Sequence, residues 1–269
     1  MAPATYQKVV TEMLDLRNCD LDNLNSVTKY PSIPTYHSLD PRNGGLLDDR
    51  VPFTGPVIGT EKVDGTNARI ITLPDGSYLL GSREELLYAK GDLIGNPALG
   101  IVAELRRVAD ALPVPAADRI EVRFLEVYGG KVTGASKNYT GDRRVGHRLF
   151  DAIHLTDYED LLAQPRAALS DWREAGNQPF LAEEELQKLA AADGLTLTPR
   201  LFILDAVDLP DGMEETQAFL TQHLPHTLSG LDDSAVGTPE GIVLRTPDRS
   251  TIAKARFQDY SRTLKRRNR

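Results

Sequence analysis

Hydrophobic positions near the start of the chain recur three or four residues apart within residues 4–16, which predicts an amphipathic opening helix. A stretch rich in proline and glycine follows, up to about Pro56, and predicts loops. Beyond it the pattern changes to short β-branched runs separated by turn residues. The runs at 68–73 and 78–80, joined at Pro74-Asp75-Gly76, predict a β-hairpin.

The rest of the chain alternates between strand-like and helix-like segments. Asn96 followed by Pro97 predicts a helix N-cap ahead of apolar positions that recur at helical spacing over 99–108. The segment 157–194 is rich in Ala, Leu and Glu and predicts helices. Because the strands are not separated by regular crossover helices, we expect an α+β protein with mostly antiparallel strands. The remaining elements are expected to be strands at 119–128, 147–155, 200–207 and 240–257, the last a pair joined at Pro247-Asp248, and a helix at 213–224.

Composition narrows the class of protein. The chain has 269 residues, 41% of them hydrophobic and 26% charged, which excludes an intrinsically disordered or disulfide-stapled protein. Its single cysteine, Cys19, allows no internal disulfide, which is typical of a reducing compartment. No apolar run approaches the roughly 18 to 20 residues of a membrane span, and the start of the chain does not resemble a signal peptide. We therefore expect a cytoplasmic enzyme that does not bind membranes.

The net charge of −8 is unevenly distributed. From Lys254 to the end of the chain, seven basic residues face one acidic residue, which leaves −14 on residues 1–253. The overall balance argues against a protein that coats nucleic acid nonspecifically. The basic tail, residues 258–269, is either a solvated terminus or an arm that contacts phosphates. In the second case the residues that contact nucleic acid are Arg262, Lys265, Arg266 and Arg267.

Lys62 is the first candidate for chemistry. It lies at the expected end of a strand within Glu61-Lys62-Val63-Asp64-Gly65-Thr66-Asn67, two residues before an Asp-Gly turn. A lysine at this position is exposed at the rim of a cleft. The alternative is an ordinary surface lysine, because average residue frequencies produce Lys-x-Asp-Gly by chance in roughly one chain of this length in twenty.

Glu126 is the second candidate. Strand alternation places its carboxylate on the face that Ile120, Val122 and Phe124 should make apolar. A buried unpaired carboxylate is costly, so Glu126 needs a hydroxyl, a cation or a metal as its partner. The alternative is a glutamate at a strand end that already reaches solvent.

The last two expected strands supply two further elements. The first is the segment 240–245, which begins with Glu240 and ends with Arg245, and in the second Lys254 and Arg256 share one strand face. Two cations on an inward face repel each other, and phosphate anions are the usual reason to tolerate that arrangement. The alternative is an edge strand protected by its charges.

Taken in order, these elements resemble the motifs of the covalent nucleotidyltransferase superfamily, which contains RNA ligases, DNA ligases and mRNA capping enzymes. The residues after Lys62 and the upstream segment 29–33 with His37 are most similar to the nick-sealing RNA ligase branch. The resemblance rests on Lys62-Val63-Asp64-Gly65 as the nucleophile motif, Glu126 with Tyr128-Gly129 as the third motif, residues 240–245 as the fourth and Lys254-Ala255-Arg256 as the fifth.

The resemblance implies a fold. We expect one nucleotidyltransferase (adenylation) domain over residues 1–257, built from two mainly antiparallel sheets with flanking helices and with the nucleotide between the sheets. The region 157–224 would be a helical insert or a set of flanking helices. Because the chain ends 13 residues after Arg256, we expect no C-terminal OB-fold, which argues against a DNA ligase or a capping enzyme.

The resemblance also implies an activity, that of an ATP-dependent RNA ligase. Lys62 would attack the α-phosphorus of ATP, the resulting lysyl-AMP would pass AMP to an RNA 5′-phosphate, and an RNA 3′-hydroxyl would complete the seal. A lysine amine is protonated at neutral pH, so neighbouring cations or bound Mg²⁺ must favour its neutral form. Lys254, Arg256 and Mg²⁺, or Mn²⁺ in its place, would also neutralise charge as pyrophosphate leaves.

Roles for the nucleotide-binding residues follow from the same resemblance. In the base-stacking motif, at 147–151, either His147 or Phe150 could stack on the base. The other assignments are Glu126 to a ribose hydroxyl, Glu240 to the metal, Glu61 to the adenine edge, Arg83 to the ribose or the RNA 5′-phosphate, and Asn67 and Arg245 to the nucleotide.

Two other functions stay open. The chain could be a nucleotidyltransferase that passes its nucleotide to another acceptor, or an inactive module that binds nucleic-acid ends. Intact Lys62, Glu126, Glu240 and Lys254 favour an active enzyme. The expected substrates are ATP and RNA with 5′-phosphate and 3′-hydroxyl ends, as in RNA repair, and no obligate protein partner is expected.

Overall fold

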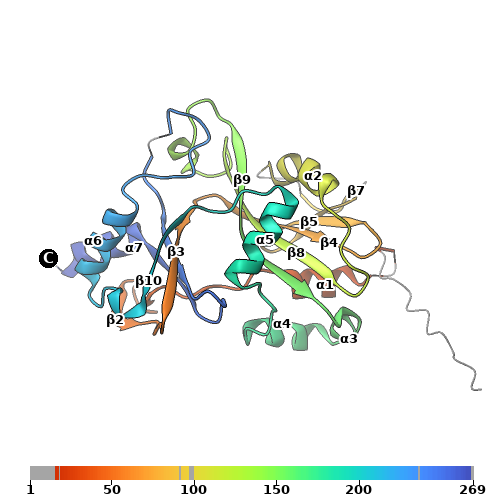
Figure 1. The fold of residues 1–269 in the computed structure, drawn as a ribbon, viewed down its shortest axis with the longest axis horizontal. Helices are drawn as coiled ribbons and strands as arrows, with labels where there is room; N and C mark the ends of the chain where they lie inside the picture. Colours follow the sequence, from red (N-terminus) through yellow and green to blue (C-terminus); the bar gives the residue numbers. More distant parts are fainter. Residues whose placement is uncertain (1–15, 18, 91, 97–99, 236, 268–269) are drawn as a thin grey trace, which may run out of the picture.

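Two antiparallel sheets make up the two halves of the molecule, and helices lie on the outside of each (Figure 1). The computed structural model describes residues 16–267 except 18, 91, 97–99 and 236. Every pairing between the named strands is antiparallel, so the expectation of an α+β protein with two mainly antiparallel sheets is confirmed.

The larger sheet has six strands and contains the predicted hairpin. Its turn is fixed locally, because Gly76 has a φ of +79° and the Asp75 carboxylate accepts a hydrogen bond from the Ser77 amide at 2.8 Å. In sheet order its strands are β7 (Asp92–Leu93), β6 (Leu86–Ala89), β5 (Tyr78–Ser82), β4 (Thr66–Thr72), β8 (Ile120–Gly129) and β9 (Val145–Leu155).

Helices cover both faces of this sheet, so its central strand β8 is apolar on both sides. Leu125 and Val127 pack toward two helices on one face, and Val122 and Phe124 pack toward three on the other. The first pair of helices is α2 (Ile101–Ala111) and α5 (Glu183–Asp193), and the second set is α1 (Leu21–Thr28), α3 (Tyr158–Leu162) and α4 (Arg166–Glu174).

The smaller sheet has four strands, and its outer face packs on two helices and a short two-stranded ribbon. Its strand order brings the two ends of the domain together, because β3 pairs directly with a strand about 180 residues later in the chain. The strands are β10 (Arg200–Asp205), β3 (Pro56–Lys62), β11 (Gly241–Arg245) and β12 (Ile252–Arg256), the helices are α6 (Met213–His223) and α7 (Phe257–Arg267), and the ribbon is β1 (His37–Leu39) with β2 (Leu46–Arg50).

Strand alternation decides what the inner face of the small sheet presents. In β12, Ala253 and Ala255 are buried in the core against α6 and α7. Their neighbours Lys254 and Arg256 point to the other side, toward the larger sheet. The predicted placement of these two cations on one inward face is therefore confirmed.

Most predicted elements are present, and three predictions are wrong. The stretch between residue 16 and Pro56, expected to be loops, contains α1, β1 and β2. The helix α1 begins where the Asp20 carboxylate accepts hydrogen bonds from the Asp22 and Asn23 amides, each at 3.0 Å. The predicted cap Asn96 is not the cap of α2, whose N-cap is Gly100. The basic tail is the packed helix α7 up to Arg267.

Two other predictions concern the segments 4–16 and 157–224. The opening helix at 4–16 lies almost entirely outside the described residues. The region 157–224 holds α3, α4, α5 and α6 together with β10, which pairs with β3, so it flanks the sheets and is not a purely helical insert. Among the described residues, no helix is long and apolar enough to cross a membrane.

Candidate active site

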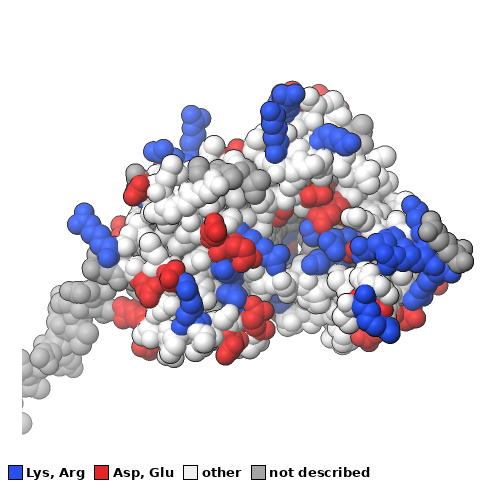
Figure 2. Space-filling view, turned by 180° about the vertical axis from the view of Figure 1, so that it is seen from behind, with Lys and Arg blue, Asp and Glu red and all other residues white. Residues whose placement is uncertain are grey.

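A cavity of about 370 Å³ lies between the two sheets, a size suited to a small-molecule ligand. The small sheet contributes its inner face, the large sheet contributes residues of β4, β8 and β9, and residues 30–33 close one side. Figure 2 shows basic side chains gathered beside a hollow near the middle of one face of the molecule. The predicted residues that line the cavity are Glu61, Lys62, Asn67, Arg83, Glu126, Phe150, Glu240, Arg245, Lys254 and Arg256.

Lys62 and Glu240 form an ion pair at the edge of this cavity. Lys62 is the last residue of β3 and pairs in register with Gly241 at the start of β11, which brings Glu240 beside it. The distance from Lys62 Nζ to Glu240 Oε2 is 2.5 Å, and the two side chains are 24% and 19% exposed. The pair is thus partly solvated, and either partner can exchange for another ligand.

The turn after Lys62 is fastened to the large sheet. The Gly65 amide donates a hydrogen bond to Glu126 Oε1 at 3.1 Å, and the Asp64 amide donates to the Tyr139 hydroxyl at 2.7 Å. A Cβ at Gly65 would lie 2.3 Å from the Val127 carbonyl oxygen, so only glycine allows this approach. The turn therefore holds Lys62 and Glu126 in the same cavity.

Glu126 has an unfavourable environment for a carboxylate. Burial raises its pKa to about 7, and the nearby Glu240 adds to this, whereas Lys62 and the Gly65 amide act in the opposite direction. Its register partner on β4 is Asn67, whose Oδ1 is buried with no hydrogen-bond partner among the described residues. The two side chains offer acceptors to a ligand that carries hydroxyl or amine donors.

Lys254 and Arg256 line the side of the cavity that β12 forms, and we call this pair of cations the cationic wall. Burial lowers the pKa of Lys254, and the neighbouring charges of Arg256 and Lys62 lower it further. Among the described residues, no hydrogen bond or ion pair engages the Lys254 ammonium group. Arg256 Nε donates to Asp259 Oδ2 at 2.7 Å, which leaves the rest of its guanidinium available. Such a wall suits a polyphosphate.

Glu61 has partners other than the one expected for it. Its side chain is 1% exposed and accepts hydrogen bonds from the Leu228 amide at 2.9 Å, from the Ser229 hydroxyl at 3.0 Å and from the Thr227 hydroxyl. Burial raises the pKa of Glu61, and these hydrogen bonds oppose the rise. The carboxylate therefore anchors residues 227–229, which we call the Glu61 strap, and the expected contact with an adenine edge finds no support here.

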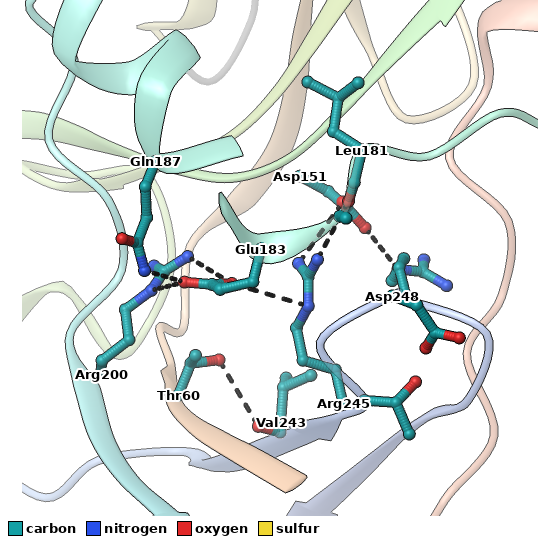
Figure 3. Close-up of polar contacts among 12 residues, drawn as sticks. Thr60, Asp151, Leu181, Glu183, Gln187, Arg200, Val243, Arg245 and Asp248 are labelled. Atoms are coloured by element: carbon teal, nitrogen blue, oxygen red, sulfur yellow. Dashed lines mark hydrogen bonds and ion pairs between the residues drawn. The ribbon is translucent and has the colours of Figure 1, made fainter. Parts of the chain in front are cut away.

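Arg245 is buried in a network of ion pairs at one end of the cavity (Figure 3). Its side chain is 2% exposed, lies 3.5 Å from Asp151 and 3.9 Å from Glu183, and donates to the Leu181 carbonyl at 3.2 Å. Glu183 in turn pairs with Arg200 at 2.8 Å. Because these partners come from β9, α5 and β10, Arg245 ties the two sheets together.

The two aromatic candidates lie on opposite sides of the large sheet. Phe150 lines the cavity, and its ring lies 5.0 Å from that of Tyr30. His147 Nδ1 lies 2.7 Å from the Glu104 carboxylate on α2, away from the cavity, so the expectation that His147 could stack on the base is wrong. Arg83 is at the cavity rim, where it donates to the Ser32 hydroxyl at 2.6 Å.

The four basic residues expected in a tail lie on α7, outside the cavity. Arg262 pairs with Asp259 at 3.1 Å, and Arg267 pairs with Asp48 of β2 at 3.0 Å. Arg266 donates to the Asn43 carbonyl at 3.1 Å, and Lys265 is exposed. The expectation of a solvated terminus is wrong, because the same helix buries Tyr260 and Thr263.

The donor set fits a magnesium ion held partly by a substrate. No group of three or more His, Cys, Asp or Glu side chains able to hold a metal occurs in the described part of the chain. Magnesium needs no such cage, since it is commonly bound by one or two carboxylates together with phosphate oxygens and water. Glu240 and Glu126 both face the cavity and can serve in this way.

Sequence reasoning missed several residues that build the site. Tyr139 holds the turn after Lys62, Asp259 holds Arg256, and the Glu61 strap closes on β3. The spacing of Asp259 three residues after Arg256 and three before Arg262 is the one local signal among these. The other contacts join residues 75 or more positions apart.

Comparison with known proteins gives a family and a fold. A family model described as RNA ligase matches residues 55–265, whereas a search of curated proteins finds no significant match. RNA ligase from Naegleria gruberi, solved as a point mutant with ATP and Mn, aligns at 14% identity and a TM-score of 0.53 over 89% of this chain and 63% of that one. The same ligase with PPi aligns at 16% identity and a TM-score of 0.52 over 89% and 64%.

A further mutant of that ligase with ATP and Mn aligns at 15% identity and a TM-score of 0.51, over 80% of this chain and 52% of that one. Identities this low establish a shared fold. The chain spans about half to two thirds of the length of these structures.

Proposed function

The chain belongs to the RNA ligase family, and on that basis we propose that it is an ATP-dependent RNA ligase whose nucleophile is Lys62. The observation that carries the proposal is the convergence of Lys62, Glu240 and Lys254 on one cavity between the two sheets. The Naegleria gruberi ligase of the same fold was solved with ATP and Mn, which supports ATP and a divalent metal as ligands.

In the first step Lys62 Nζ attacks the α-phosphorus of ATP. The Lys62 ammonium group first gives up one proton, which frees the lone pair of Nζ. A phosphorus–nitrogen bond then forms as the bond to the pyrophosphate oxygen breaks, and Nζ loses a second proton. Glu240 Oε2 lies 2.5 Å from Lys62 Nζ and can receive a proton from it directly or through water. Lys254 and Arg256 face the cavity from β12 and would stabilise the negative charge on the departing pyrophosphate.

The later steps transfer AMP and seal the strand. An oxygen of the RNA 5′-phosphate attacks the lysyl-AMP, the phosphorus–nitrogen bond breaks and Lys62 regains a proton. An RNA 3′-hydroxyl then attacks the activated 5′-phosphate, forming the phosphodiester and releasing AMP. Magnesium, when bound, would neutralise phosphate charge, with Glu240 as its protein ligand. Arg83 lies at the cavity rim and would receive the 5′-phosphate.

The nucleotide would lie with its base and ribose toward the large sheet. Phe150 supplies an aromatic surface for the base, and Glu126 with Asn67 supplies acceptors for ribose hydroxyls or base amines. Arg245 acts on the nucleotide mainly by holding the sheets in place, because its guanidinium is already paired with Asp151.

The test is covalent labelling by α-labelled ATP followed by sealing of a nicked duplex. Wild-type protein should retain the label and release pyrophosphate, Lys62→Ala should retain none, and Lys62→Arg should fail equally because a guanidinium stays protonated. The folded state should survive both changes, since the Lys62–Glu240 pair is partly solvated. Labelling of Lys62→Ala at the wild-type rate would refute the assignment, and labelling without sealing would indicate transfer to another acceptor.

A further inference from the structure

One face of α7 carries a continuous stripe of polar and basic side chains. Its members recur at helical spacing, three or four residues apart, and they line a shallow surface hollow of about 390 Å³, largely open to solvent, that we call the basic groove. The opposite face of the helix is buried, because Tyr260 and Thr263 pack into the protein and Thr263 accepts a hydrogen bond from the Leu46 amide at 2.9 Å. The groove is lined by Gln258, Ser261, Arg262, Lys265 and Arg266.

The cations in this groove are only partly neutralised. Lys265 is exposed, and within the described ranges no carboxylate pairs with it. Arg266 contacts a carbonyl oxygen, that of Asn43, which offers no compensating charge. Arg262 shares the Asp259 carboxylate with Arg256. Arg267 differs, because it lies outside the stripe and pairs with Asp48.

The basic groove lies on the helix that directly follows β12, the strand that carries Lys254 and Arg256 into the cavity. The helix begins at Phe257, one residue after Arg256, and the Asp259 carboxylate joins Arg256 in the cavity to Arg262 in the groove. Figure 2 shows basic side chains forming a band from the central hollow toward the end of the molecule that carries α7. An 11-residue helix extends this band by about 16 Å.

We propose that the basic groove binds the phosphodiester backbone of the RNA strand whose end occupies the cavity. The inference rests on the proposed function, which brings an RNA end to Lys62. Residues 1–253 carry −14, so the surface away from this band repels phosphates and a local cationic track is needed to hold RNA. Continuity with the cavity favours RNA over an acidic protein surface as the occupant.

The test compares Lys265→Ala/Arg266→Ala with a control of equal charge change, Arg107→Ala/Lys188→Ala, whose residues are exposed on α2 and α5, away from the groove. Binding of a 5′-phosphorylated RNA is measured across a KCl series, using protein without ATP. The groove variant should bind more weakly, and the slope of log affinity against log salt should fall by about 1.4 to 1.8 for two lost phosphate contacts. The control should keep the wild-type slope.

Lysine adenylylation is measured in parallel with α-labelled ATP, because this separates the two proposals. If the wild-type protein takes no label, but its RNA-binding salt slope still exceeds that of the groove variant, the proposed function is refuted and the groove remains an RNA site. An unchanged slope in the groove variant would overturn the RNA track even if labelling is normal. An equal loss of labelling and RNA binding would also overturn it, since α7 would then be acting on the cavity.

Discussion

Lys62 Nζ lies 2.5 Å from Glu240 Oε2, so the proposed nucleophile and the proposed metal ligand are each other's partners in the structure. The register of β3 with β11 creates this pair, because Lys62 aligns with Gly241. A cation that binds Glu240 competes directly with the Lys62 ammonium group. If Glu240 holds the metal as proposed, metal binding and release of Lys62 would be coupled through one carboxylate.

Removal of the Glu240 carboxylate should test whether metal binding is coupled to the reactivity of Lys62. We expect Glu240→Ala to lower the rate of covalent labelling by ATP roughly 100-fold, because the metal and the displaced proton both lose their partner. Raised Mg²⁺ should restore only part of the rate, as hard cations need oxygen ligands. Glu84→Ala removes an exposed carboxylate that pairs with Lys29 and serves as the control. A rate that depends on Mg²⁺ concentration as in the wild-type protein would show that Glu240 is not the ligand.

Glu126 should make stability depend on pH. Its pKa of about 7 lies above the usual 4.5, so its contribution to stability is complete below about pH 4.5 and is lost as pH rises through about 7. Glu126→Gln removes this dependence. The free energy of unfolding of the variant, relative to wild type, should therefore rise by on the order of 2 kcal/mol between about pH 5 and about pH 8.

Urea unfolding at the two pH values measures this change. The exposed Glu214→Gln on α6 is the matched control and should show no such rise. A constant difference between Glu126→Gln and wild type across the range would mean that Glu126 is ionised without cost in the folded protein.

The Glu61 strap should contribute to stability more than to base selection. Glu61→Ala leaves the Thr227, Leu228 and Ser229 donors without their acceptor, which should destabilise the protein by about 2 to 4 kcal/mol. Glu61→Gln should cost less, because its amide keeps one acceptor oxygen.

The ratio of labelling by ATP to labelling by GTP should stay at the wild-type value in both Glu61 variants. Thr227→Val should add little to Glu61→Ala, since both remove the same contact. A changed nucleotide preference in a protein of normal stability would restore the adenine-edge role.

Substitutions of Phe150 and His147 should have different effects on the KM for ATP. Phe150→Leu should raise the KM for ATP about 10-fold, since stacking on an aromatic side chain contributes about 1 to 3 kcal/mol per base. His147→Ala should change the KM by less than about two-fold, because its ring pairs with Glu104 on the far side of the sheet. Melting curves check that Phe150→Leu, which loses the ring contact with Tyr30, still folds. The reverse order of effects would place the base elsewhere.

Much of this site follows from local pattern. A strand repeats every two residues, so the segment 252–256 alone places Lys254 and Arg256 on one face, and the structure has them there. The same alternation puts the Glu126 carboxylate on the side of Phe124, toward the cavity. The helix α7 also had a signal that sequence analysis did not use, because Phe257, Tyr260 and Leu264 recur at helical spacing beneath the basic charges.

Sequence alone could not decide which partners lie across the chain. Glu61 accepts hydrogen bonds from the strap, which is more than 160 residues away in the sequence. No sequence feature near either segment indicates that the two are in contact. The choice between His147 and Phe150 needed the tertiary structure for a definite reason. In the pairing of β8 with β9, Phe124 aligns with Asp151 and Leu125 aligns with Leu149, so Phe150 is an extra residue, a β-bulge.

That bulge breaks the two-residue period on which sequence reasoning depends. It brings Phe150 to the cavity and the neighbouring Asp151 to Arg245 and the Tyr30 hydroxyl, whereas Leu149 remains on the opposite face of the sheet. Motif spacing by itself thus identified the proposed nucleophile, the two carboxylates and the two cations that line the cavity. Only the pairing of β8 with β9 decided which aromatic ring faces the cavity, because register and bulges depend on contacts between strands and not on the order of residues within one.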